Sequence, residues 1–358
     1  MTHILVYTDA AGIGGAEISL GNLLATVPPE MQITIAGIHP PVIDAIAKCR
    51  PNSKPIKLSN FAHHLRVFRK FDIIHFNCCT PWANRLGLTA ALFLPQLRIL
   101  RVDQLPLRTT DAATLWTTRA LCLRVDAHVA VGQKSAELME NFYALGRNSV
   151  LSIPNGVPDS VAPAPPRSSS PMIVGSIGRL DAMKAHDILL QALAQVEKVQ
   201  AVILGEGDER SNLEKLAIEL GIRDRVQFRG WVDHPRAHLA EFDVVAMPSR
   251  SEGFPLAMVE AMLAEKPVIA TRVGSMPEAI VPDRTGLLIE KNDINGLARA
   301  LAQFRDQSEL RIKLGQQARQ DALEQWTSEA MAAKYRALWE SVLSAPPKPR
   351  LIVDRPKD

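Results

Sequence analysis

The sequence lacks several features that mark common classes of protein. None of its apolar runs approaches the roughly 18–20 residues that a membrane-spanning helix needs, and its four cysteines form no Cys-x-x-Cys pair. The adjacent Cys78 and Cys79 suit neither a structural zinc site nor a disulfide framework. The N-terminus runs directly into a predicted strand, 4–7, without the pattern of a signal peptide. We therefore expect reduced thiols and a cytoplasmic protein.

The sequence also lacks a large excess of positive or negative charge. The 358 residues carry a formal net charge of only +3, so we expect no nucleic-acid partner. Residues 1–160 hold 15 Lys and Arg against 11 Asp and Glu. This mildly basic half would suit an anionic membrane surface or an anionic acceptor.

Short β-rich runs alternate with helical runs along the chain. This alternation predicts parallel sheets covered on both faces, and hence an α/β fold of two Rossmann-like domains whose sheets face a central cleft. The predicted strands are 4–7, 32–37, 72–76, 98–102 and 128–131, then 172–177, 201–204, 226–228, 244–247, 268–270 and 287–289. Predicted helices include 188–196, 211–220 and 256–264.

A proline-rich segment separates the two series of strands. Because proline removes backbone donors and fixes φ, we interpret 161–171 as a linker between an N-terminal domain, 1–160, and a C-terminal domain, 172–327. The amphipathic segment 328–345 predicts a terminal helix that packs back on the N-terminal domain. The stretch 346–358, rich in proline and charge, is expected to be a loose tail.

A glycine-rich turn follows the first predicted strand. Gly12, Gly14 and Gly15 let the backbone turn sharply and approach a ligand, and the N–H groups that open the next helix attract anions. A tight turn without a ligand explains the glycines equally well. Their spacing differs from the Gly-x-Gly-x-x-Gly of dinucleotide-binding domains, which counts against an NAD-dependent dehydrogenase.

Two basic residues follow the first strand of the second series. Arg179 and Lys184 come directly after Gly178 and the strand 172–177. Arginine offers a planar fork of donors and lysine a point charge, a combination that suits a diphosphate. Either residue alone would be typical of a solvated surface charge, but their shared position after a strand favours an anion site.

The strongest motif combines two glutamates. Glu252 lies in a polar loop after strand 244–247, and Glu260 lies on the predicted helix 256–264. Pro255, directly before this range, suits the start of a helix. The two carboxylates can accept hydrogen bonds from hydroxyl groups at opposite ends of one extended ligand. Solvent exposure is the simpler alternative. The apolar neighbours of Glu260 disfavour it, since an idle carboxylate is costly to bury.

In these motifs and in their order, the sequence resembles glycosyltransferase family 4, the retaining group 1 glycosyltransferases of GT-B fold. The resemblance spans nearly the whole chain, and the Glu-x7-Glu spacing is highly specific. The matching segments are Gly14-Gly-Ala-Glu17, Asp72-Ile-Ile-His75, Ile153-Pro-Asn-Gly-Val157, Gly178-Arg179 with Lys184, Gly205-Glu-Gly-Asp208, 249–255 with Glu260, 266–270, 274–278 and 285–288.

The resemblance implies roles for the site residues. Arg179 and Lys184 would bind the diphosphate of a nucleotide-sugar donor. Glu252 would hold the transferred sugar, and Glu260 would accept the ribose hydroxyls. Further donor contacts would come from the loop near the base, the loop before the helix and the N-terminal glycines, namely Gly230, Trp231, Val232, Gly253, Phe254, Pro255, Leu256, Gly14 and Gly15.

One departure from the family pattern concerns catalysis. Family members usually carry a histidine just after the strand that corresponds to 98–102, where it lines the sugar site, whereas this chain has Asp103 at about that place. We therefore include Asp103 with Glu252, Lys184 and Arg179 among the catalytic candidates. The family works without a bound metal, and the chain has no Asp-x-Asp motif, so we expect no metal and no cofactor besides the nucleotide-sugar substrate.

These implications predict a metal-independent, retaining hexosyltransferase. It would move a sugar from a nucleoside-diphosphate sugar, with UDP favoured, to a hydroxyl acceptor that is a saccharide or a lipid-linked saccharide. The resemblance favours a role in bacterial surface polysaccharide or glycolipid synthesis. The alternative is a non-catalytic or regulatory nucleotide-sugar-binding protein of the same fold, which would bind the donor without transferring the sugar.

A basic amphipathic helix is predicted within 61–71. Phe61, Leu65 and Phe68 share one face of it, beside basic residues. We favour the interpretation that this face packs on the N-terminal sheet. The alternative is peripheral contact of the N-terminal domain with the inner face of an anionic membrane.

Overall fold

The chain forms two α/β units. The computed structural model describes residues 2–51, 53–160, 162–164 and 170–348. One unit comprises Met1–Pro158 together with the chain from Ser328 onward, and the other comprises Asp159–Thr327. Part of the predicted linker and most of the predicted tail lie outside the described residues.

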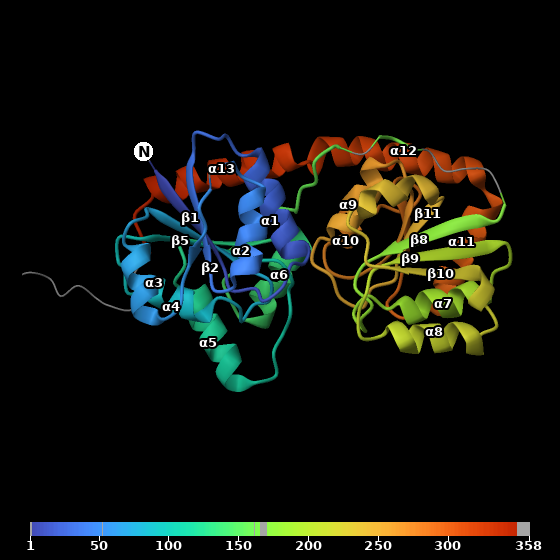
Figure 1. Ribbon diagram of the computed structural model, residues 1–358, viewed down its shortest axis with the longest axis horizontal. Helices are drawn as coiled ribbons and strands as arrows, with labels where there is room; N and C mark the ends of the chain where they lie inside the picture. The colour runs from blue at the N-terminus through green and yellow to red at the C-terminus, as the bar shows by residue number, and fades with distance from the viewer. Residues whose placement is uncertain (1, 52, 161, 165–169, 349–358) are drawn as a thin grey trace, which may run out of the picture. The chain divides into compact units, whose positions relative to one another are not determined.

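Over the described residues, the first unit contains a seven-stranded parallel sheet in the order β3-β2-β1-β4-β5-β6-β7. Figure 1 labels β1, β2 and β5 of this sheet. Its strands are β1 (His3–Thr8), β2 (Gln32–Gly37), β3 (Ile56–Lys57), β4 (Ile73–Cys78), β5 (Arg98–Asp103), β6 (Ala127–Ala130) and β7 (Leu151–Ser152). Its helices are α1 (Gly15–Thr26), α2 (Pro40–Lys48), α3 (Phe61–Phe68), α4 (Arg85–Leu92), α5 (Ala112–Cys122), α6 (Gln133–Phe142) and α13 (Ser328–Ser344).

Helices cover both faces of this first sheet. Side chains of α1, α2 and α13 share one core with β1, β2 and β4, and those of α3 and α4 share another on the opposite face. Phe68 of α3 is fully buried, with Phe61 and Leu65 partly buried around it. The interpretation that this helix packs on the sheet is therefore confirmed. On the other face, α13 places Tyr335 and Trp339 against His75 of β4.

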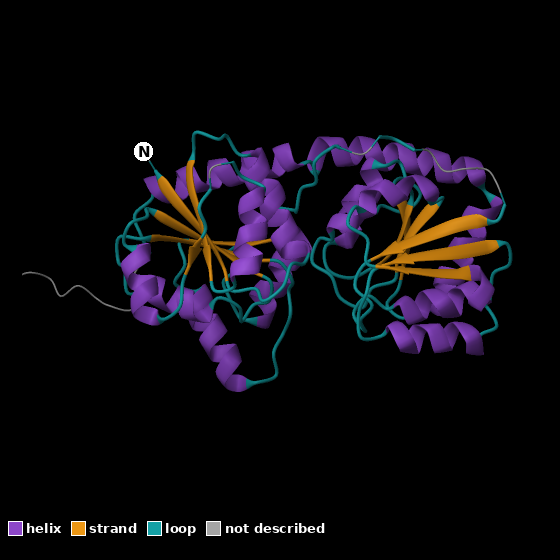
Figure 2. Cartoon of the chain, viewed as in Figure 1, coloured by secondary structure: helices purple, strands orange, loops and turns teal. Residues whose placement is uncertain are grey.

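Over its described residues, the second unit contains a six-stranded parallel sheet in the order β10-β9-β8-β11-β12-β13. Figure 2 shows its strands in orange, with helices in purple on both sides. Its strands are β8 (Met172–Ile177), β9 (Val199–Leu204), β10 (Val226–Gly230), β11 (Val244–Met247), β12 (Val268–Thr271) and β13 (Gly286–Ile289). Its helices are α7 (His186–Ala194), α8 (Arg210–Glu219), η1 (Arg223–Arg225), η2 (Pro235–Glu241), α9 (Leu256–Leu263), α10 (Met276–Ala279), α11 (Ile294–Asp306) and α12 (Ser308–Gln325).

The strand order reverses at the middle of this second sheet. β8 is flanked by β9 on one side and by β11 on the other, so the connections that leave β8 and β11 run to opposite faces of the sheet. Figure 1 shows α7 and α8 on one face and α9 and α12 on the other. In open parallel sheets, ligands bind beyond the carboxyl ends of the strands at such a reversal. The prediction of two Rossmann-like parallel sheets is confirmed.

Two further expectations concern the chain as a whole. Cys49, Cys78, Cys79 and Cys122 carry free thiols. Among the described residues, no helix combines the length and the apolar character that crossing a membrane would require.

Candidate functional site

The loops that follow β8 and β11 bring together most of the predicted catalytic residues. The loop after β8 carries Arg179 and Lys184, and the loop after β11 carries Glu252. Because the two strands are parallel neighbours, both loops emerge at the same edge of the sheet. This edge is where the reversal of strand order predicts a ligand.

Lys184 and Glu252 form an ion pair at this edge. Lys184 Nζ lies 2.6 Å from Glu252 Oε1, and Ser249 Oγ donates a second hydrogen bond to the same oxygen at 2.8 Å. The Glu252 residue is only 7% exposed. Its other oxygen, Oε2, accepts no hydrogen bond from any residue that the structure describes. One carboxylate oxygen is thus fixed while the second can accept a hydrogen bond from a ligand hydroxyl.

Arg250 ties the two loops together, and the sequence analysis did not identify it. Its backbone N–H donates to Met183 O at 2.7 Å, and its guanidinium bonds both carboxylate oxygens of Asp187 at 3.0 and 2.6 Å. A third contact runs from Arg250 Nη1 to Ala182 O at 2.8 Å. Such a fork of donors holds the loop of Glu252 in register with the loop of Lys184.

Gly274 packs closely against the backbone of the Glu252 loop. Its φ is +52°, and a Cβ at this position would lie 2.0 Å from the carbonyl oxygen of Glu252. Ser275 N also donates to Gly253 O at 2.9 Å. Only glycine combines this backbone conformation with so close an approach. The resemblance included Gly274 in a matching segment, but its contact with Glu252 is visible only in the structure.

Arg179 is placed differently from Lys184. Its side chain is 71% exposed and pairs with Asp181 at 3.0 Å in the same loop. An exposed pair of this kind contributes little to stability, so its guanidinium can exchange Asp181 for an anionic ligand at low cost.

Glu260 lies on α9 and is paired with an arginine that the sequence analysis did not identify. Arg236 Nε donates to Glu260 Oε1 at 2.8 Å, and the side chains are 23% and 8% exposed. As in Glu252, the second oxygen of Glu260 accepts no hydrogen bond from a residue within the described ranges. The two carboxylates therefore share one arrangement, with one oxygen held by a cation and the other without such a bond.

The segment between the two glutamates can meet a ligand mainly through its backbone. The side chains of Phe254 and Leu256 are buried, and the ring of Phe254 packs near that of Trp326, with centroids 5.8 Å apart. Pro255 is the residue that caps α9 and precedes its first turn. Since Pro255 has no N–H, Gly253 and the first residues of α9 supply the available donors.

The loop after β10 reaches the same edge of the sheet. Gly230 ends the strand with φ +74°, and the indole of Trp231 is 69% exposed. Trp231 Nε1 donates to Asp233 at 3.3 Å, and Val232 beside it is half-buried. An exposed aromatic ring at a strand end is suited to stacking on a planar base.

The N-terminal glycines belong to the first unit. Gly14 caps α1 and Gly15 begins it, and a Cβ on Gly15 would meet no atom within 4 Å. Glu17 Oε2 accepts the N–H of Gly14 at 3.0 Å, and burial raises the pKa of this carboxyl group. Glu17 therefore satisfies one of the donors at the start of the helix.

Asp103 does not line a ligand site in the structure. It ends β5 with no exposed surface, and its carboxylate bonds Arg101 at 2.8 and 2.9 Å and His128 of β6 at 2.5 Å. Burial opposes ionisation, but the Arg101 guanidinium and the His128 ring outweigh it and lower the pKa of Asp103 to about 2. The expectation that Asp103 takes the place of the sugar-site histidine is not met, because its partners hold it inside the domain.

The same cluster has a spacing that could suit a metal. Asp103, Cys122 and His128 offer ligand atoms within 4.8 Å of one another. However, Arg101 already neutralises Asp103, and burial raises the pKa of the Cys122 thiol to about 12. A cysteine binds a metal as its thiolate, so these residues fit a buried ion-pair network better than a metal site.

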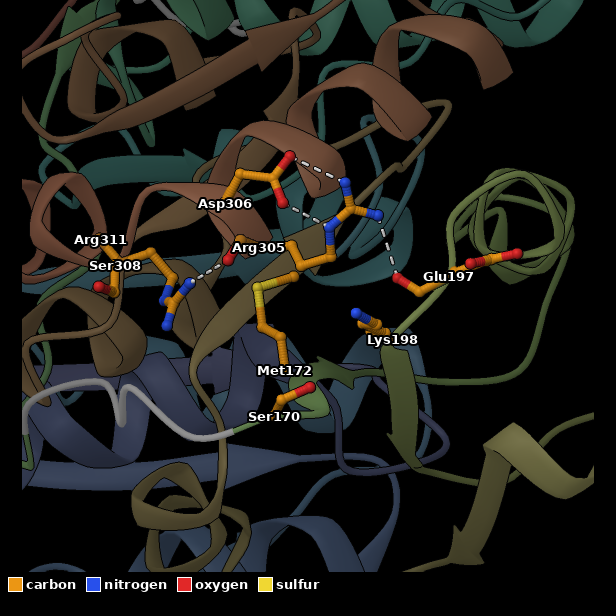
Figure 3. A pocket seen from close by; sticks show the side chains of 8 residues that line it. All are labelled: Ser170, Met172, Glu197, Lys198, Arg305, Asp306, Ser308 and Arg311. Carbon is orange, nitrogen blue, oxygen red and sulfur yellow. Dashed lines mark hydrogen bonds and ion pairs between the residues drawn. The ribbon is translucent and has the colours of Figure 1, made fainter.

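A hollow of about 400 Å³ opens at the opposite, amino-terminal edge of the second sheet. Figure 3 shows Arg305 between Asp306 and Glu197, beside Lys198 and Arg311. The Arg305 guanidinium is neutralised by Asp306 at 2.7 Å. This hollow adjoins the starts of β8 and β9, so it is not part of the arrangement around Lys184 and Glu252.

Comparison with known proteins identifies the family of the chain. Residues 162–321 match the family model for glycosyl transferases group 1. The lipopolysaccharide core biosynthesis glycosyltransferase LpsE of Rhizobium meliloti is 32% identical over 80% of this chain and 80% of its own length. The N-acetyl-alpha-D-glucosaminyl L-malate synthase of Bacillus anthracis is 35% identical over 49% of this chain and 47% of its own length.

Solved structures support the fold independently. The crystal structure of Anabaena HepE in complex with UDP covers 95% of this chain and all of its own, with a TM-score of 0.85 at 20% sequence identity. The predicted GT-B architecture is thus confirmed. From the family model and the extent of the match to LpsE, the chain belongs to the group 1 glycosyltransferases.

Proposed function

We propose that this glycosyltransferase moves a sugar from a nucleoside-diphosphate sugar, with UDP as the preferred nucleotide, to a hydroxyl acceptor with retention at the anomeric carbon. The observation that carries the proposal is the shared arrangement of Glu252 and Glu260. Each carboxylate is held by a cation through one oxygen, Glu252 in the loop after β11 and Glu260 on α9, the helix that follows this loop.

The proposed assignment follows the chemistry of the donor. Glu252 accepts hydrogen bonds from the hydroxyls of the transferred sugar, and Glu260 accepts them from the ribose. Lys184 and Arg179 neutralise the diphosphate, and Trp231 lies against the base. We also propose that the first unit binds the acceptor, and that Gly14 and Gly15 of this unit contribute to the donor contacts.

The proposed reaction proceeds on one face of the sugar. The bond from the anomeric carbon to the leaving phosphate oxygen breaks as the acceptor oxygen forms a bond on that same face. The acceptor proton passes to the leaving phosphate oxygen, so no separate base is needed. Lys184 and Arg179 stabilise the charge that develops on the diphosphate, the role that a metal ion fills in other transferases, and we propose that the reaction is metal-independent.

Similar proteins support a nucleotide-sugar donor. HepE was crystallised with UDP and with UDP-glucose, whereas the Mycobacterium tuberculosis relative that is 33% identical over 44% of this chain is described as GDP-mannose-dependent. The names of LpsE and of a Staphylococcus aureus poly(ribitol-phosphate) transferase favour a saccharide or other surface polymer as the acceptor.

A lipid-linked acceptor would require contact of the first unit with a membrane surface. The apolar face of α3 is used in the core, so α3 does not provide this contact. Exposed Trp116 and Leu123, in and just after α5, would be the apolar contacts in a peripheral association, with Arg119 5.7 Å from the Trp116 ring. Co-sedimentation with anionic vesicles tests this part of the proposal, and recovery of all protein in the supernatant contradicts it.

A panel of nucleotide sugars tests the donor assignment. Thermal unfolding with UDP-, GDP- and ADP-sugars should show the largest stabilisation with a UDP-sugar, by about 2.7 kcal/mol at 100 times its Kd. Release of UDP from the best donor then separates an enzyme from a binding protein. Stabilisation without any UDP release, in the presence of a range of saccharide acceptors, would favour the non-catalytic alternative.

A further inference from the structure

Arg236 lies where it can control the carboxylate of Glu260. It belongs to η2, which follows the exposed loop at Trp231, and it reaches across to α9. Its Nε donates to Glu260 Oε1 at 2.8 Å, and its Nη1 lies 3.4 Å from Ser160 Oγ. Among the residues that the structure describes, Arg236 is the hydrogen-bond partner of the Glu260 side chain.

The surroundings of Glu260 make this contact necessary. Its neighbours along α9, Met258, Val259, Ala261 and Met262, have no exposed surface, and the Glu260 side chain is 8% exposed. A carboxylate so nearly buried is costly unless a cation or donors compensate its charge. Since Nε of a planar guanidinium donates in one direction, the contact holds Oε1 and thereby restrains the directions that Oε2 can take.

We propose that Arg236 is a positioning residue that aims Glu260 at the ribose and thereby sets the preference of the donor site for ribose over deoxyribose. The inference rests on the proposed function, in which Glu260 receives the ribose hydroxyls. Once the bound ligand covers a restrained Oε2, a missing ligand hydroxyl leaves this oxygen buried without a donor, and such an acceptor is penalised. A carboxylate that is free to turn can find water instead, so it discriminates less.

Isothermal titration with UDP, 2′-deoxy-UDP and 3′-deoxy-UDP measures this preference directly. We expect the parent protein to bind UDP about 10- to 100-fold more tightly than the deoxy analogue that lacks the bonded hydroxyl. Arg236→Gln should weaken UDP binding and leave the affinity for that analogue nearly unchanged, so the preference falls to within about threefold. Arg236→Lys, which keeps the charge, should retain part of the preference.

Arg229→Gln is the matched control. Arg229 lies in β10, next to its last residue, and pairs with Glu241 at 2.7 Å, with both side chains partly exposed. This substitution removes the same charge nearby without touching Glu260, and the ribose preference should persist. Glu260→Gln should lower the preference by itself, and adding Arg236→Gln to it should lower the preference no further, because both act through one carboxylate.

The outcomes separate this inference from the function on which it rests. If Arg236→Gln weakens UDP and both deoxy analogues equally, or leaves the preference at the parent value, Arg236 is a structural residue and the inference is wrong. If Glu260→Gln abolishes the ribose preference but Arg236→Gln preserves it, the inference about Arg236 is likewise wrong, while the proposed function stays intact. A folded parent protein that binds no UDP overturns the proposed function and this inference with it.

Discussion

Lys184 permits a sharp test of the candidate site, because its structural and its proposed catalytic role respond differently to mutation. Its ammonium group lies 2.6 Å from Glu252 Oε1, and in the proposed reaction it also meets the leaving diphosphate. We expect Lys184→Ala to lower kcat by about 10²–10³, the usual cost of losing one preorganised contact to developing charge.

The structural cost of the same substitution is smaller. The Lys184 and Glu252 side chains are 21% and 9% exposed, and Ser249 still donates to Glu252 once the ammonium is gone. A partly compensated carboxylate of this kind costs about 1–3 kcal/mol, against the roughly 5–15 kcal/mol that stabilise a typical domain. The variant should therefore remain folded, and unfolding cannot account for the expected loss of rate.

The assay is release of UDP from a UDP-sugar, with thermal unfolding measured on the same samples. Lys215→Ala, an exposed position on α8, is the control and should behave like the parent. The double variant Lys184→Met with Glu252→Gln removes both charges, so it should regain part of the lost stability without regaining rate. A folded Lys184→Ala enzyme with near-normal kinetics would refute the reasoning.

Three further predictions address the supports of the site and the core. Gly274→Ala should displace the Glu252 loop, because its Cβ would lie 2.0 Å from Glu252 O; UDP release should fall, and unchanged kinetics would contradict this. Burial lowers the pKa of His75 to about 3, so the unfolded chain binds a proton below about pH 6.5 that the folded chain does not. Stability should then be lost as the pH falls from about 6 toward 3, and His75→Leu should flatten this loss by about 1.4 kcal/mol per pH unit in chemical denaturation. Asp103→Asn leaves Arg101 buried without its counter-charge and should cost about 3–5 kcal/mol of stability; a rate defect without a stability change would restore Asp103 as a catalytic residue.

The elements of the fold could be predicted where burial imposes a clear pattern. Strands 32–37, 172–177 and 244–247 coincide with β2, β8 and β11, because strands covered on both faces are largely apolar. By contrast, β3 (Ile56–Lys57) and β7 (Leu151–Ser152) have two residues each at the edges of the first sheet and were not predicted. Two residues carry no periodicity that could distinguish a strand from a loop.

Only those residues of the candidate site that belong to sequence motifs could be predicted. The sequence placed Lys184 and Glu252 each in a loop after a strand, and the structure joins the two side chains by a hydrogen bond. The side to which Asp103 points depends on Arg101 and on His128 of the neighbouring strand, a contact across 25 residues of sequence. Arg236, 24 residues before Glu260, is likewise connected to it only through the tertiary fold.

A crystal structure of the protein with UDP tests the central claim most directly. The account predicts the diphosphate within hydrogen-bond distance of Lys184 and Arg179 at the carboxyl edge of the second sheet, with the ribose hydroxyls on Glu260. UDP bound at another place on the molecule, or no bound UDP at saturating concentration while Lys184 and Glu252 stay paired, would contradict it.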